Sequence, residues 1–182
     1  MTMFLPPMDS PLYLVSVGIT NTRLLAIPVT LGSIAAVLAS ASYGYAHGRL
    51  GIHGLSATTM GFMGLALLVA GSVSSIPLFT AAIVVHSAML ALIAPNINAA
   101  ALMLSPPGRG SQAIGLANGM MFGSQLLVPF IASSIRSATS LAGVFLAFGG
   151  AALAIGIAIY SYFGVIRRGA RAATSMPTSL PD

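Results

Sequence analysis

The sequence predicts an all-α membrane protein with five transmembrane helices, and three observations lead to that prediction. Of 182 residues, 57% are hydrophobic and only 5% are charged, whereas soluble domains carry about 25% charged residues. The apolar residues also gather in stretches of 19 residues or more, about the length that a helix needs to cross the hydrocarbon core. Strand-like alternation is absent, and lipid cannot satisfy the backbone of an open sheet. Helices therefore remain as the spanning elements.

Five apolar stretches, each bounded by Arg, Gly, Pro or Ser, are the predicted spans. They cover residues 24–46, 55–73, 76–104, 111–135 and 141–166, within a transmembrane domain of residues 23–169. No Asp, Glu, Lys or Arg occurs from Ile52 to Gly108, so a short turn joins the second and third spans into a helical hairpin. Pro95 and Pro129 lie inside the third and fourth spans, where proline is expected to kink a helix.

The two ends of the chain differ from the spans. Residues 1–22 contain Pro6, Pro7 and Pro11 and are too short to cross alone, yet their apolar side chains disfavour water. We expect a remnant of a truncated span or an interfacial segment there, and no signal peptide, because a basic start is missing. Residues 170–182 are small and polar, which predicts a disordered cytoplasmic tail.

The charged residues predict an orientation. All seven cations are arginines, against two acidic residues, for a net charge of +5. These arginines form no basic stripe with interleaved aromatic residues, so the sequence does not predict nucleic-acid binding. With a cytoplasmic C-terminus, the inner side would hold Arg49, Arg109, Arg167, Arg168 and Arg171, and the outer side Arg23 and Arg136. The positive-inside rule favours this arrangement in a multi-pass plasma (cell inner) membrane protein.

Two spans carry stripes of small residues, which let helices approach closely in lipid. The first span and its continuation have Gly32, Ala36, Ser40, Gly44 and Gly48, and the fourth has Ser111, Gly115, Gly119 and Gly123, in steps of four. Such spacing arises by chance or for routine packing about as often as for a special purpose. Two stripes that flank the hairpin nevertheless suggest faces that close against protein absent from this chain.

Polar side chains concentrate in the third and fourth spans. The third carries His86, Asn96 and Asn98, and the fourth carries Asn118 and Gln125. Polar groups in hydrocarbon normally face a bundle interior or water, so these spans should line any cavity, with the second and fifth as lipid-facing support. His86 is a candidate for binding a solute or carrying a proton, or it packs between helices. The amides could bind a solute, but interhelical hydrogen bonding is the more frequent role.

Nothing in the sequence predicts catalysis. Cysteine is absent, which excludes thiolate nucleophiles and Cys-based metal sites, and no metalloprotease, serine-hydrolase or phosphate-loop motif occurs. The two acidic residues, Asp9 and Asp182, lie near the termini. We expect no enzyme activity, no metal and no cofactor, and proton coupling would have to use His86 or another protein.

Three runs of residues resemble the C-terminal half of a major facilitator superfamily (MFS) transporter. The run G-Y-A-H-G-R-L-G from Gly44 to Gly51 resembles the family's cytoplasmic loop signature, although His47 replaces its acidic residue and only Arg49 remains of its basic cluster. The run P-N-I-N-A from Pro95 and the run from Arg109 to Asn118, followed by Gly123 and Pro129, are similar to the pattern of the tenth and eleventh helices.

The resemblance implies helices eight to twelve of an MFS fold, with a remnant of the seventh at the start. It implies cytoplasmic loop or gating roles for Gly44, Gly48, Arg49, Gly51, Arg109 and Gly110, and helix-packing roles for the small stripes. The implied function is efflux of a small organic solute by a secondary transporter, whose two halves rock against each other. We therefore expect a fragment, or a half that needs an N-terminal six-helix partner and is inactive alone.

A non-transporting alternative stays open. A membrane scaffold or partner subunit would use the same small-residue faces to dock another membrane protein. In both interpretations the lipid bilayer is the surrounding solvent, and nucleic acid is not a partner.

Overall fold

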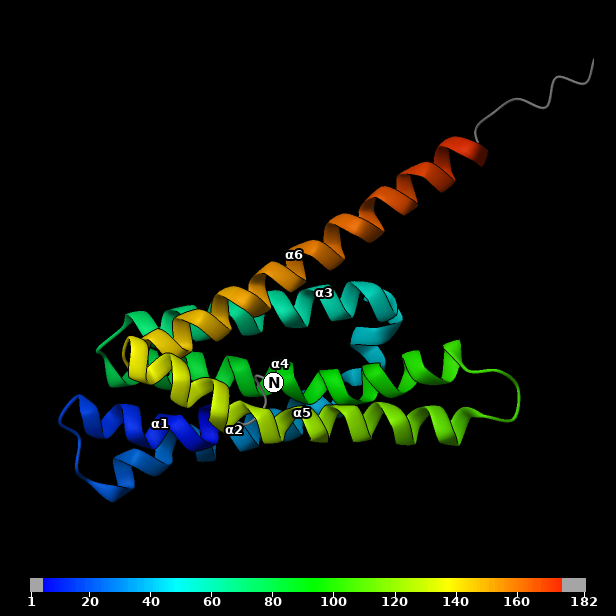
Figure 1. The fold of residues 1–182 in the computed structure, drawn as a ribbon. Helices are drawn as coiled ribbons and strands as arrows, with labels where there is room; N and C mark the ends of the chain where they lie inside the picture. The colour runs from blue at the N-terminus through cyan, green and yellow to red at the C-terminus, as the bar shows by residue number, and fades with distance from the viewer. Residues whose placement is uncertain (1–4, 175–182) are drawn as a thin grey trace, which may run out of the picture.

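The computed structural model describes the backbone of residues 5–174 and the side chains of residues 10–164. The described residues form six helices, which pack as a bundle (Figure 1). They are α1 (Leu5–Ser16), α2 (Thr22–Ala41), α3 (Tyr43–Ser72), α4 (Ile76–Leu104), α5 (Gly110–Ala138) and α6 (Leu141–Thr174). All but α1 are long and apolar enough to cross a membrane, which confirms the prediction of five apolar helices.

The helix boundaries follow local signals in the sequence. Asn21 precedes α2 and its side chain accepts a hydrogen bond from the Arg23 amide at 3.0 Å, an N-cap interaction. Pro77 lies in the first turn of α4, where a missing amide hydrogen costs nothing. Helices α4 and α5 continue through Pro95 and Pro129, so neither proline ends its helix.

The corner between α2 and α3 differs from the prediction. Helix α2 ends at Ala41, so the first predicted span, residues 24–46, is five residues too long. The predicted loop that follows is helical instead: residues 43–50 form the first part of α3, which breaks at Gly51 with φ 66° and ψ 176°. This backbone conformation is accessible essentially only to glycine. Figure 1 shows the short segment turning the chain between α2 and the long part of α3.

A cluster of buried apolar side chains lies at the end of the bundle where α3 turns into α4. Tyr13, Phe79 and Phe145 meet there, with ring centroids 4.9 to 5.9 Å apart. The Tyr13 hydroxyl donates to the Val73 carbonyl at 2.8 Å, which satisfies the phenol. Helix α1 is therefore anchored in the core through its C-terminal half.

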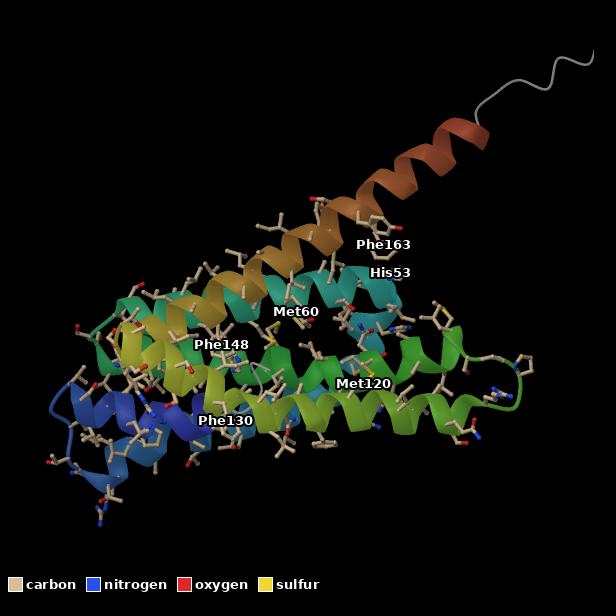
Figure 2. The ribbon with its side chains drawn as sticks, viewed as in Figure 1. His53, Met60, Met120, Phe130, Phe148 and Phe163 are labelled. Atoms are coloured by element: carbon tan, nitrogen blue, oxygen red, sulfur yellow. The ribbon has the colours of Figure 1, made fainter. Side chains whose placement is uncertain are left out.

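The most extensive helix pair joins α3 and α6, which the sequence analysis assigned to lipid-facing support. Their backbones nearly touch: a Cβ at Gly149 would lie 2.8 Å from the Leu68 amide nitrogen, and one at Gly156 would lie 2.7 Å from that of Gly61. Near the far end of the pair, His53 stacks on Phe163 at 3.6 Å between ring centroids (Figure 2). These two helices form the packed side of the bundle.

Helix α6 continues to Thr174, so the first five residues of the predicted disordered tail are helical. The rest of that segment, residues 175–182, lies outside the described part of the chain.

Candidate functional site

A cavity of about 260 Å³ lies between α2 and α4, at the middle of both helices. The third and fourth spans were expected to line a cavity, whereas this cavity lies between the first and third. It is partly open to the outside of the bundle, and ten residues line it: Val29, Gly32, Ser33 and Ala36 of α2, and Ile83, His86, Ser87, Leu90, Ala91 and Ala94 of α4.

Small residues on α2 create this cavity. Gly32 is buried against α4, where an added Cβ would lie 2.6 Å from the Ser87 hydroxyl oxygen. Ala36, one turn later, borders the cavity with only a methyl group. The first part of the predicted stripe thus brings α2 and α4 together and leaves space beside the contact, whereas Ser40 is exposed.

Three polar side chains border the cavity, near the middle of α2 and α4. His86 is fully buried and belongs to the wall. The Ser33 hydroxyl donates to the Val29 carbonyl at 2.9 Å, and Ser87 makes no hydrogen bond within the described residues. His86 was predicted from its polarity inside a span, whereas Ser33 and Ser87 were not predicted. Their signal in the sequence is one hydroxyl residue near the middle of each of two spans.

Asn96 forms hydrogen bonds between α4 and α3. Its side chain is buried on α4, and Nδ2 donates to the Ile52 carbonyl at 3.0 Å and to the Ser56 hydroxyl oxygen at 2.8 Å. Ser56 itself donates to the Ile52 carbonyl at 2.9 Å. Asn96 therefore ties α4 to the first turn of α3 after the Gly51 break, which is the interhelical role that the sequence analysis weighed against solute binding.

We expect Asn96→Leu to destabilise the bundle by about 1 kcal/mol, because interhelical hydrogen bonds in membrane proteins contribute on average about 0.6 kcal/mol each and at most about 1.7. The matched control is Asn98→Leu, two residues along α4, where a buried Oδ1 has no partner in the described structure and little stability should be lost. Unfolding of both variants in detergent micelles gives the comparison. Equal losses would contradict the role of Asn96.

The other predicted amides lie apart from the cavity. Asn98 is half-buried on α4, and Asn118 and Gln125 are half-buried on α5. None of the three borders the space between α2 and α4. The structure therefore brings only His86 of the five polar candidates to this cavity.

The residues expected in cytoplasmic loops gather at one end of the bundle. Gly44, Gly48 and Arg49 lie in the helical segment 43–50, where the Arg49 guanidinium sits 4.7 Å from the centroid of the Tyr45 ring, a cation–π contact. Arg109 directly precedes the first residue of α5, Gly110, after a turn in which its amide donates to the Pro106 carbonyl at 3.1 Å.

The three glycines of the stripe on α5 face open space. Added Cβ atoms at Gly115, Gly119 and Gly123 would meet open space, and only Val128 and Ala132 of this helix are buried. Gly44 and Gly48 are similarly open. The helix-packing role is therefore realised within the chain for Gly32 and not for the α5 glycines.

A larger hollow, of about 350 Å³, lies between α3, α5 and α6. Its wall is formed by apolar side chains alone, among them Met60 and Phe148 (Figure 2). Such a surface offers no hydrogen-bonding group to orient a ligand. Among the described residues, no group of three His, Cys, Asp or Glu side chains could hold a metal ion.

The comparisons with known proteins identify no relative: no family model, curated protein or solved structure matches the chain.

Proposed function

We propose that the chain forms the second half of an MFS-type secondary transporter that exports a small organic solute. The cavity at the middle of α2 and α4 carries this proposal, because secondary transporters bind their solutes near the bilayer midplane. Its polar wall groups, at a depth where polar side chains are costly, are typical of functional positions in membranes.

Two further features support the proposal. The runs around Gly44–Gly51 and from Pro95 to Pro129 resemble MFS motifs. In addition, α2 and α5 present large exposed apolar side chains, including Val37 and Leu38 on α2 and Leu126 and Phe130 on α5. A six-helix partner half would cover part of these surfaces, and the complete transporter would rock the two halves around the midplane cavity.

The arginines support a plasma-membrane orientation with a cytoplasmic C-terminus. Arg49 precedes the break in α3, and Arg109 lies in the connection from α4 to α5, so alternating helices bring both to one end (Figure 1). Arg23 and Arg136 lie at the opposite end, in the first turn of α2 and the last turn of α5. The end richer in arginine faces the cytoplasm by the positive-inside rule.

An efflux measurement in the native cells tests the proposal. Cells are loaded with a panel of small organic solutes, and efflux is compared among strains that lack the chain, carry it, or carry Ala36→Phe or Ile157→Phe. Phe at position 36 occupies the cavity and should lower export of the transported solute by about tenfold or more. Ile157 is 58% exposed on α6, away from the cavity and from the surfaces of α2 and α5, so Ile157→Phe should leave export unchanged.

If removal of the chain changes the efflux of no solute in the panel, the transport proposal fails. A scaffold that docks another membrane protein is then the second candidate, favoured by the open glycine face of α5. For a scaffold, Gly119→Leu should release the partner from the chain, as measured by cross-linking in the membrane, while Ala36→Phe should have no effect. For a transporter half, both Gly119→Leu and Ala36→Phe should lower efflux.

A further inference from the structure

From the cavity between α2 and α4, we infer the class of solute: a small, uncharged, mainly apolar molecule that carries one hydrogen-bonding group, with Ser87 as the residue that recognises this group. The inference rests on the proposed function for the role of the site, but it concerns binding, which can be measured without transport.

The volume limits the size of the ligand. Apolar cavities of about 150 Å³ hold a benzene molecule, and sites for drug-sized ligands span about 300–1,000 Å³. At about 260 Å³, this cavity falls between the two and has room for one or two fused rings.

The wall excludes a charged ligand. Its residues carry no carboxylate, ammonium or guanidinium group among those that the structure describes. The described cationic side chains nearest in sequence, Arg23 and Arg49, lie outside the middle of the spans. An ion that left water for this site would lose its hydration without gaining an opposite charge, and this loss is costly.

The polar part of the wall favours one hydrogen bond. The hydroxyl of Ser33 already donates to the backbone, and His86 has no exposed surface. Ser87 is half-buried, borders the cavity and makes no hydrogen bond within the described residues. Its hydroxyl can donate to a ligand or accept from one, whereas Val29, Ile83 and Leu90 provide the apolar contacts.

Indole is a suitable probe, since it is neutral, bicyclic and carries a single N–H donor. The chain contains no tryptophan, so the fluorescence of indole can be followed without an indole background from the protein. Tryptamine and indole-3-acetate present the same ring with a positive or a negative charge. Binding is measured by equilibrium dialysis of the full chain in lipid nanodiscs against empty nanodiscs, which corrects for partition into lipid.

The expected result is saturable binding of one indole per chain. We expect roughly fivefold weaker binding for Ser87→Ala, which removes one hydrogen bond, and no measurable saturable binding for Ala36→Phe. Val37→Phe, its exposed neighbour on α2, should bind as the native chain does. Both charged analogues should bind at least about tenfold more weakly than indole. Circular dichroism of each variant establishes that the helices are retained.

Three outcomes would overturn the inference: no saturable indole binding, binding that Ser87→Ala and Ala36→Phe leave unchanged, or equal affinity for a charged analogue. These outcomes are independent of the efflux result. If the chain supports efflux but does not prefer indole to its charged analogues, only the inferred solute class is wrong. If the chain binds indole but supports no efflux, only the transport proposal is wrong.

Discussion

Replacement of Gly149 by leucine is expected to force α6 away from α3 and to destabilise the bundle by about 3 kcal/mol, near the upper end of typical overpacking costs. A Cβ at this position would lie 2.8 Å from the Leu68 amide nitrogen and 2.9 Å from the Gly64 carbonyl oxygen. Both are backbone atoms within a continuous helix, so they cannot rotate away as a side chain does. The two helices must separate to admit the new side chain.

Gly150, one residue further along α6, provides the control. A Cβ there would meet nothing within 4 Å, so Gly150→Leu changes the composition of the same helix without a clash. Glycine in a helix is less favourable than leucine by somewhat under about 1 kcal/mol, and Gly150→Leu should be neutral or slightly stabilising. Unfolding of both variants in detergent micelles measures the difference, and a loss of the same size at both positions would contradict the steric explanation.

Spin labels report the separation itself. The chain has no cysteine, so labels attach only at introduced positions, and Phe62 on α3 and Ile157 on α6 are exposed enough to carry them. With Gly149→Leu the distance distribution between the labels should broaden and lengthen, whereas Gly150→Leu should leave it unchanged.

The extent of the helices could be predicted from the sequence because their limits are set locally. The predicted span 76–104 coincides with α4, and the span 111–135 lies within α5. Between these two spans, turn-forming residues and an arginine gather at residues 105–109, and this local cluster is enough to place the neighbouring helix ends within a few residues.

Helix pairing could not be predicted in the same way, because several helices offer small-residue faces and only the assembled bundle selects among them. The glycines of the stripe on α5, such as Gly115, stay open, while α3 and α6 pack most closely. The signal for that pair was a spacing of seven residues, between Gly64 and Gly71 on α3 and between Gly149 and Gly156 on α6. This spacing also places both residues on one helix face, but the sequence analysis considered steps of four.

The candidate cavity was predictable only in part for the same reason. His86 was identified from its polarity inside a span, and this property is local. That Ser87 faces Gly32 depends on how α2 and α4 are rotated against each other, and no local property of either helix determines this rotation. Asn96 was identified as a polar residue in a span, but its contacts with Ile52 and Ser56 depend on the break in α3.

Gly51→Ala is expected to cost about 1–3 kcal/mol, the range for backbone strain of this kind. At φ 66° and ψ 176°, a Cβ is strained against the backbone of residue 51 itself. The strain has no other source, because the added Cβ would meet no other atom within 4 Å. Gly48→Ala, within the helical segment 43–50 and equally free of contacts, should be slightly stabilising because alanine favours a helix. Unfolding in micelles distinguishes the two.

The same substitution should also weaken the contact that Asn96 makes. In the alanine variant the strain is relieved if residues 43–50 straighten into line with the rest of α3, and this moves Ile52 relative to α4. The loss caused by Asn96→Leu should then be smaller in the Gly51→Ala background than in the native chain, a non-additivity of roughly 0.5 kcal/mol or more for residues in one network. Strict additivity in this double-mutant cycle would mean that Asn96 holds α3 independently of the break, and would contradict the coupling between the corner and α4.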